Sequence, residues 1–114
     1  MTLTLAWPPS VNTYYRHVGH KTLISAAGRA YRANVLASVT EQGTPRTKGR
    51  VRVTAIAHPP DKRRRDLDNL WKSLLDSLTH ALVIEDDSLI DDLRITRAEP
   101  QKPGRIILTI EAIA

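Results

Sequence analysis

Ten residues near the middle of the chain, Asp61–Leu70, combine a run of cations with closely spaced carboxylates. The run Lys62–Arg65 is followed at once by Asp66 and Asp68, and Lys72 lies four residues after Asp68. Consecutive Lys and Arg side chains suit the phosphates of a polyanion, whereas carboxylates suit a hard divalent cation such as Mg²⁺. These charges either neutralise one another or divide those two tasks between them.

A second acidic segment lies downstream, where EDDSLIDD (residues 85–92) holds five of the twelve acids of a chain whose net charge is +5. An EF-hand fits badly, because a loop beginning at Asp66 would place Leu70 and Trp71 where a ligand and a glycine are needed. Mg²⁺ instead takes a few carboxylates together with water and phosphate oxygens. Two aspartates at the head of a helix and one from the loop after it would serve, provided that the two ends meet across the sheet.

Carboxylates beside Lys and Arg are suited to the hydrolysis of a phosphodiester. A metal ion lowers the pKa of a bound water and neutralises charge that develops on phosphorus. Lys72 could position the attacking water or stabilise the scissile phosphate. The sequence offers no Ser-His-Asp or Cys-His arrangement, no phosphate-binding glycine loop and no zinc spacing among its four histidines. A small-molecule substrate is therefore not expected.

Simpler explanations exist for each of these residues. An aspartate at a helix start is commonly a cap, and Asp68 with Lys72 could form a surface ion pair contributing about 0.3–0.5 kcal/mol. Acidic runs are mostly solvated turns. The residues alone support a metal-dependent nuclease and a non-catalytic nucleic-acid-binding domain about equally. A basic RNA- or ribosome-associated protein is a third interpretation.

The first half of the chain predicts the elements that precede this site. LTLAW (3–7) predicts a strand that ends at two prolines, and residues 10–24 predict a polar, basic surface loop, with a possible short strand pairing. Ser25 can cap a helix over 26–42 that ends at Gly43. The buried face of that helix would carry Tyr31, Val35 and Val39.

The second half predicts a strand, a strong helix and two more strands. Residues 50–58 alternate, with Val51, Val53, Ala55 and Ala57 on one side. Residues 67–82 form the strongest helical pattern, and the apolar positions that define its stripe are Leu67, Leu70, Trp71, Leu74, Leu78 and Leu82. The opposite face carries Asp68, Lys72 and Asp76. LRITRA and RIILTIE predict two strands joined by a turn. The expected fold is a single α+β domain over 1–114, ordered β-α-β-α-β-β, with two helices packed on a small mixed sheet.

Composition sets the remaining bounds. A chain of 114 residues with 41% hydrophobic residues fits one domain with one core. The absence of cysteine excludes disulfides and suits a reducing cytoplasm, which is the expected location. No stretch approaches the ~18 apolar residues of a membrane span, so no membrane association is expected.

At this point the sequence resembles the RusA family of Holliday junction resolvases, and the resemblance covers nearly the whole chain. It rests on WPPSVNTYYRH, PDKRRRDLDNLWKSLLDSL, IEDDSLIDDLRITR and PGRIILTI, in that order. The second block is the most specific, because a basic run precedes D-L-D-N, a lysine lies four residues after the second aspartate, and a D-D pair follows. The resemblance implies a homodimeric, Mg²⁺-dependent endonuclease, with Mn²⁺ as a substitute ion, that nicks four-way junction DNA during recombination and repair.

Site residues follow from the same resemblance, position by position. The metal-binding aspartates correspond to Asp66, Asp68 and Asp87, and the active-site lysine to Lys72. Contact with DNA is implied for two segments, whose residues are Lys62, Arg63, Arg64, Arg65, Asn12, Tyr14, Tyr15 and Arg16. A C2 dimer would match the approximate two-fold symmetry of the junction.

Several neighbouring residues stay open at this stage. For Glu85 and Asp86 a solvated position is favoured over a supporting role in metal binding, and Asp91 and Asp92 are interpreted as structural or as limiting non-specific affinity for DNA. Trp71 is expected in the core rather than as a platform for bases, because it lies on the apolar stripe.

Overall fold

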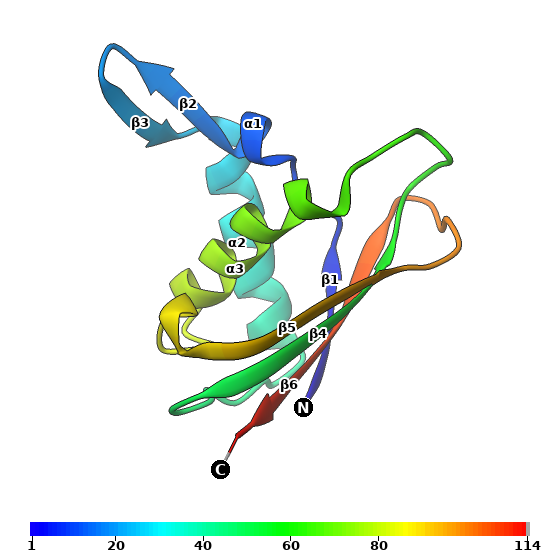
Figure 1. Ribbon diagram of the computed structural model, residues 1–114. Helices are drawn as coiled ribbons and strands as arrows, with labels where there is room; N and C mark the ends of the chain where they lie inside the picture. Colours follow the sequence, from blue (N-terminus) through cyan, green and yellow to red (C-terminus); the bar gives the residue numbers. More distant parts are fainter. Residues whose placement is uncertain (114) are drawn as a thin grey trace.

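The alternating pattern of residues 50–58 builds a central strand of a four-stranded mixed sheet. In the computed structural model, which describes residues 1–113, β4 (Val51–His58) pairs antiparallel with β6 (Arg105–Ala112) and parallel with β5 (Ile90–Arg97). β1 (Thr2–Ala6) pairs antiparallel with the other side of β6, giving the order β1-β6-β4-β5 (Figure 1). The side chains predicted to face inward from β4 are all buried: Val51, Val53, Ala55 and Ala57.

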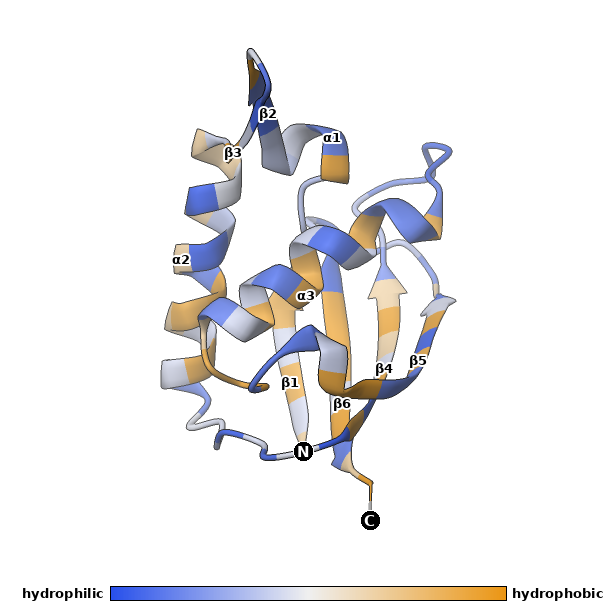
Figure 2. Cartoon of the chain, turned by 60° about the vertical axis from the view of Figure 1, so that its left-hand side comes forward, coloured by the Kyte–Doolittle hydropathy of each residue, from blue (hydrophilic) through white to orange (hydrophobic). Residues whose placement is uncertain are grey.

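Two helices cover the buried face of this sheet, as the sequence predicts for an α+β fold. α2 (Ala26–Glu41) begins where Ser25 Oγ accepts a hydrogen bond of 3.0 Å from the amide of Gly28. Its inward face carries Tyr31, Val35 and Val39, all buried. Figure 2 shows the apolar residues gathered along the strands and on the helices that lie over them. No helix in the described part of the chain is long and apolar enough to cross a bilayer.

The second helix is shorter than its apolar stripe suggests. The first turn is a separate 3₁₀ segment, η1 (Leu67–Leu70), and α3 (Trp71–His80) follows directly. Trp71 packs against the core as expected. Leu82, by contrast, lies beyond the helix with a φ of +61° and is 55% exposed, so its assignment to the stripe is wrong. It matches the helical period by coincidence, because the chain has already left the helix and turns back into the core through Val83 and Ile84.

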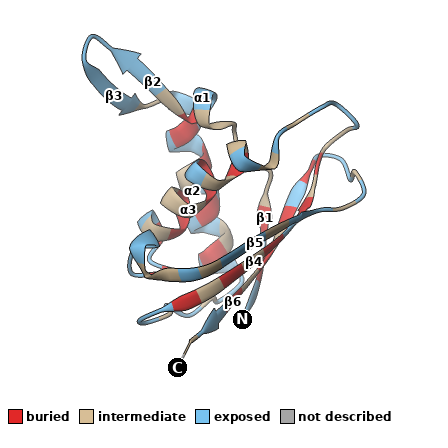
Figure 3. Cartoon of the chain, in the orientation of Figure 1, coloured by how far each residue is buried: buried red, intermediate tan, exposed pale blue. Residues whose placement is uncertain are grey.

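Residues 10–24 are more ordered than the surface loop that the sequence predicts, and the short strand pairing that the sequence also allows is confirmed. They form the short helix α1 (Val11–Tyr14) and a hairpin of β2 (Tyr15–Val18) with β3 (Lys21–Ile24). The expected element order is therefore incomplete, because it lacks this unit between β1 and α2. The hairpin projects from the body and is largely exposed (Figures 1 and 3).

The hairpin unit is held to α2 by a close backbone approach. A Cβ added at Gly28 would lie 2.5 Å from the carbonyl oxygen of Tyr14, so a side chain there would push α1 away from α2. Ser25 reinforces the contact, because its hydroxyl donates to the carbonyls of Thr13 and Tyr14 at 2.6 and 2.9 Å. Glycine and serine at the start of α2 thus fix where α1 sits.

The two edges of the sheet differ. At the β1 edge, the side-chain amide of Gln42 accepts from Thr4 N at 3.0 Å and donates to Thr4 O at 2.8 Å, as a neighbouring strand would. At the other edge, β5 has one partner strand within residues 1–113, which is β4. β5 therefore presents an uncovered row of backbone donors and acceptors.

Candidate metal and nucleic-acid site

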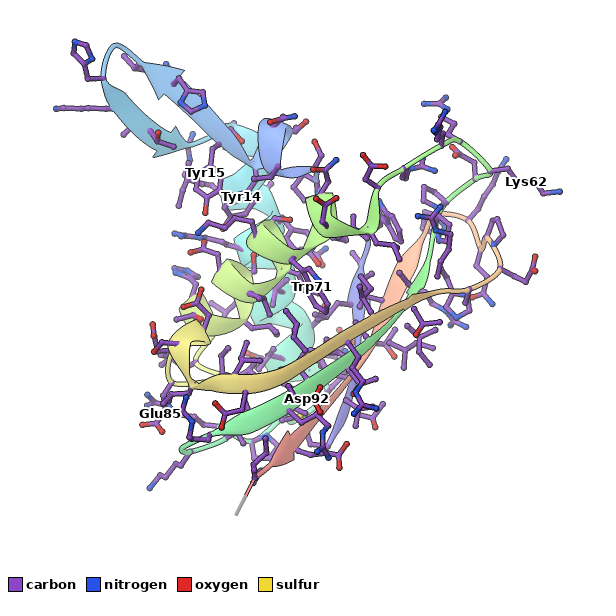
Figure 4. All side chains as sticks on the ribbon, in the orientation of Figure 1. Tyr14, Tyr15, Lys62, Trp71, Glu85 and Asp92 are labelled. Carbon is purple, nitrogen blue, oxygen red and sulfur yellow. The ribbon has the colours of Figure 1, made fainter. Side chains whose placement is uncertain are left out.

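The basic run lies in the loop between β4 and η1, at the far end of the molecule from both termini (Figure 1). Lys62, Arg63 and Arg64 are exposed, and Lys62 points away from the body (Figure 4). Arg65 differs, because its side chain is only 25% exposed and folds back on Asp61. Arg65 thus already has an anionic partner, and contact of all four cations with DNA stays a prediction.

The partner of Arg65 is strongly acidic. Arg65 Nη1 donates to Asp61 Oδ1 at 2.7 Å, and the amide of Arg63 donates to the same oxygen at 2.9 Å. These hydrogen bonds, first that of Arg65 and then that of Arg63, lower the pKa of Asp61 to about 2. Asp61 is therefore ionised at neutral pH. Lys62, Arg63 and Arg64 stay exposed to a polyanion, although Arg63 Nε also lies 3.6 Å from Asp61 Oδ2.

Asp66 and Asp68 occupy the first turn before α3, and neither performs a simpler structural task. Asp66 is the N-cap residue of η1, but its side chain makes no capping hydrogen bond. Asp68 and Lys72 are exposed, and the ion pair that their spacing permits does not form within the described residues. Neither of the simpler explanations of these carboxylates, as cap or as ion-pair partner, applies.

The acidic segment separates into bound carboxylates and one free carboxylate. Glu85 accepts from the amide of Gly49 at 2.5 Å, and Asp86 caps η2 (Asp87–Leu89) through the amide of Ser88. The next two aspartates are in β5 rather than in a loop, and each forms an ion pair: Asp91 with Arg50 at 2.6 Å and Asp92 with Arg52 at 2.8 Å. Both therefore have the structural role that was one interpretation of the sequence.

Asp87 is the free carboxylate of the segment. It is exposed, and its side chain makes no hydrogen bond or ion pair in the described part of the chain. Among the aspartates of residues 1–113, this is true of Asp66, Asp68 and Asp87, which are the three predicted metal ligands. The aspartates that form hydrogen bonds or ion pairs within the protein are thus different from the three that are available to bind another ligand.

One chain does not bring all three free carboxylates together. Asp66 and Asp68 precede α3, whereas η2 lies beyond its other end (Figure 1), and ten helical residues span about 15 Å. Within residues 1–113, no three His, Asp or Glu side chains are close enough to hold a metal ion.

The residues near the N-terminus that are predicted to contact DNA differ in their exposure. Asn12 and Arg16 are exposed, and Tyr15 is half-buried. Tyr14 is completely buried, so the expectation that it contacts DNA is contradicted. Its ring lies edge-on to that of Tyr15, with 4.8 Å between the ring centroids, and both are labelled in Figure 4.

Tyr14 instead belongs to a polar cluster that sequence reasoning missed. Its hydroxyl donates to Asp76 on α3, and Arg32 on α2 donates to Asp76 Oδ2 at 2.5 Å and to the Tyr14 hydroxyl at 2.8 Å. Burial and the hydrogen bond to Asp76 raise the pKa of Tyr14. The cluster links α1, α2 and α3 and so holds the hairpin at a fixed angle to them. The one available signal in the sequence is the place of Asp76 on the polar face of the helical pattern.

Trp7 is the second feature that the sequence does not reveal. Its ring lies beside the basic loop, with the guanidinium carbon of Arg65 5.9 Å from the ring centroid. A pocket of about 210 Å³ and a more open one of about 560 Å³ adjoin the pair, and Trp7, Arg65, Asp66 and Leu70 line both. In the sequence, Trp7 is the last residue of a predicted strand and the first residue of the block WPPSVNTYYRH, and neither fact places it beside the basic loop.

The chain is similar to known proteins along most of its length. The sequence model of the family described as Endodeoxyribonuclease RusA matches residues 6–111. Proteins named crossover junction endodeoxyribonuclease RusA are similar along most of their length. That of Enterobacteria phage HK97 is 45% identical over 93% of this chain and 89% of its own. The protein of Enterobacteria phage 82 is 45% identical over 95% of this chain and 91% of its own. That of Escherichia coli K12 is 43% identical over 96% of this chain and 92% of its own.

Proposed function

The chain belongs to the RusA family of endodeoxyribonucleases, and from this premise we propose that it resolves four-way DNA junctions by paired, symmetric nicks. The observation that carries the proposal is that the carboxylates expected to bind the metal ion are the ones that have no partner in the described part of the fold. The three carboxylates left free by the fold are those that correspond to the metal ligands of the family, and exposed cations lie in the adjoining loop.

Asp66, Asp68 and Asp87 are proposed to hold Mg²⁺, with Mn²⁺ as a substitute. Exposed carboxylates without other partners are the oxygen donors that these hard ions take. When bound, the ion would acidify a water molecule and neutralise charge on the scissile phosphate. The carboxylates have a further effect of their own, because without a cation they repel DNA from the site.

Lys72 is proposed to act on the reacting phosphate. It lies one helical turn after Asp68, is exposed and is not neutralised by that aspartate. An ammonium group at this position can donate hydrogen bonds to a non-bridging phosphate oxygen and stabilise the charge that develops there. Lys62, Arg63 and Arg64, together with Asn12, Tyr15 and Arg16, are proposed to hold the DNA backbone in register.

A homodimer is proposed because it can complete the site. β5 begins just after η2 and ends at Arg97, which donates to the carbonyl of Arg65 at 2.6 Å. The strand therefore runs from the Asp87 end of the molecule to the Asp66 end. Two β5 edges paired antiparallel about a two-fold axis, with full overlap, would set the partner's Ile90 opposite Arg97. The partner's Asp87 would then lie near Asp66.

The test is the cleavage of an end-labelled synthetic four-way junction by the purified chain, with Mg²⁺ and with EDTA. We expect paired nicks in opposite arms with Mg²⁺ and intact junction with EDTA. A linear duplex of the same sequence serves as the control for structure selectivity. Metal-independent binding without nicks would favour the alternative function, a non-catalytic DNA- or RNA-binding module, which the exposed basic loop alone would also support.

A further inference from the structure

The pocket of about 210 Å³ beside Trp7 has a mostly apolar wall. It lies where the strand β1, the basic loop, η1 and the segment after β5 meet, and the apolar residues that line it are Trp7, Pro59, Leu67, Leu70, Ala98 and Pro100. Trp7 and Leu67 are partly buried and pack against the hydrophobic core, so this wall is anchored rather than free to collapse. An apolar hollow fixed in the surface by core residues is suited to a ligand with an apolar body.

The volume of the pocket is suited to a single ring system. An apolar cavity of ~150 Å³ is sufficient for benzene, so a hollow of about 210 Å³ accommodates one heteroaromatic base. It cannot admit a stacked base pair or a helix of DNA. An aromatic side chain in the wall offers a surface on which a planar ring can stack, and the Trp7 indole is that surface.

Charge distinguishes the interior of the pocket from its rim. Inside, Asp61 and Arg65 form an ion pair of 2.7 Å and largely cancel each other. At the rim lie Lys62, Arg63 and Arg97, whose side chains are exposed cations. A phosphate would be drawn to these exposed cations rather than to the apolar wall. A neutral ring attached to that phosphate would instead find an apolar wall inside, with acceptor capacity left on Asp61 Oδ2, which lies 3.6 Å from Arg63 Nε.

We propose that this pocket receives one unpaired nucleobase of the DNA, beside the phosphate that is cut. The inference rests on the proposed function, because Asp66, a proposed metal ligand, lines the pocket and so places it next to the reaction. Extruding a base costs least where pairing is already disturbed, as at the crossing point of a four-way junction. The pocket would therefore favour a junction over continuous duplex.

The test is a double-mutant cycle between the wall of the pocket and the DNA. One change is Trp7→Leu, which keeps an apolar side chain and removes the aromatic surface. The other is an abasic nucleotide, moved one position at a time through the centre of the junction. Affinity is measured in EDTA, so the cycle reports on the pocket whether or not the chain cuts. Nicking of the intact junction in Mg²⁺ is recorded separately and tests the proposed function.

We expect Trp7→Leu to weaken binding of the intact junction roughly 5- to 150-fold, the range associated with one stacked base. At one abasic position this penalty should vanish, because the base that used the pocket is already missing. Penalties that stay the same at every abasic position would overturn the proposal, as would wild-type affinity of the Trp7→Leu variant.

A second variant guards against a folding defect, since Trp7 also packs on the core. Ala98→Leu enlarges another residue that lines the pocket and leaves Trp7 in place. Ala33→Leu, on the exposed face of α2, is the matched control. Ala98→Leu should reproduce the loss and its disappearance at the same abasic position, while Ala33→Leu should bind as the wild type does. Normal binding by Ala98→Leu would contradict an inserted base.

Discussion

Arg65 Nη1 lies 2.7 Å from Asp61 Oδ1, so the last cation of the basic run is bound to the acid that precedes the run. The pair closes the loop at its base and leaves the three residues between them at the surface. One face of the loop is thus neutral and fixed, whereas the other is cationic. The four adjacent cations of the sequence thus divide into Arg65, which is paired with Asp61, and Lys62, Arg63 and Arg64, which are exposed.

The first prediction concerns the pH dependence of this pair. The pKa of Asp61 is lowered to about 2, from an ordinary value of 3.8. The interaction should therefore be fully present above pH 3.8 and be lost as the pH falls through about 2. Carboxyl carbon chemical shifts of Asp61, titrated by NMR, measure this directly. In an Arg65→Ala variant the midpoint should return toward the ordinary value, and an unchanged midpoint would show that Arg65 is not the cause.

The second prediction separates the exposed arginines of the basic loop from Arg65, whose side chain is mostly buried and hydrogen-bonded to Asp61. Replacing Arg63 and Arg64 together by alanine should flatten the slope of log affinity against log salt by up to about two units. Arg65→Ala is the matched comparison and should change that slope less, because Arg65 is already paired. Salt titrations of junction binding give both values, and equal slope changes per arginine would contradict the division.

At saturating protein the Arg63, Arg64 double variant should also nick at nearly the wild-type rate, since the aspartates and Lys72 are unchanged. Single-turnover cleavage measures this rate. A rate that stays low at saturation would place one of these arginines at the scissile phosphate instead.

The third prediction concerns the free carboxylates. Asp68→Asn keeps the size of the side chain and removes a charged donor, so cleavage should fall by at least roughly 100-fold. Junction binding without metal should be unchanged or tighter, because a negative charge beside phosphate is gone. Asp91→Asn is the control, since Asp91 is an acid of the same region that serves Arg50. Near wild-type nicking by Asp68→Asn would exclude it as a ligand.

The fourth prediction distinguishes a site within one chain from a site shared by two. Asp68→Asn and Asp87→Asn protomers should each be inactive alone. If the partner's Asp87 completes each site, a heterodimer of the two variants has one intact site and should nick one strand. Mixing tagged variants by co-refolding and assaying the purified heterodimer gives the answer. Continued inactivity of the mixture would mean that all three carboxylates act within one chain.

The fifth prediction concerns Lys72. Lys72→Ala should slow nicking roughly 100- to 1000-fold, the scale of a lost transition-state donor, with little change in junction affinity. Single-turnover rates and binding curves are measured on the same junction. Parallel losses of affinity and rate would make Lys72 a contact to the DNA backbone and no more.

The main sheet and its helices could be predicted because local pattern and burial agree there. The alternation in β4 and the capping serine of α2 each specify an element without reference to distant residues. The free aspartates could be named from the resemblance. The sequence does not reveal which aspartates of the acidic segment lack protein partners. That depends on which arginines the sheet register places beside Asp91 and Asp92.

Sequence-based expectations fail where contacts between distant residues decide the outcome. Tyr14 lies in a polar, basic segment, yet it is buried because Asp76 and Arg32 satisfy its hydroxyl from two other helices. Leu82 fits the helical period but falls after the chain has turned. The separation of Asp66 from Asp87 likewise reflects the length and direction of α3, which spacing in the sequence does not convey.

The side chain of Gln42 has a consequence for the number of chains that can join. A sheet with two open edges can add chains without limit, as in a fibril. Here the backbone of Thr4 at one edge is occupied by Gln42, so the β5 edge is the one left to accept another molecule among the described strands of this sheet. Two chains joined there would present blocked edges to the outside, and growth would stop. In such a dimer one glutamine would make the assembly self-limiting and so protect the protein against aggregation.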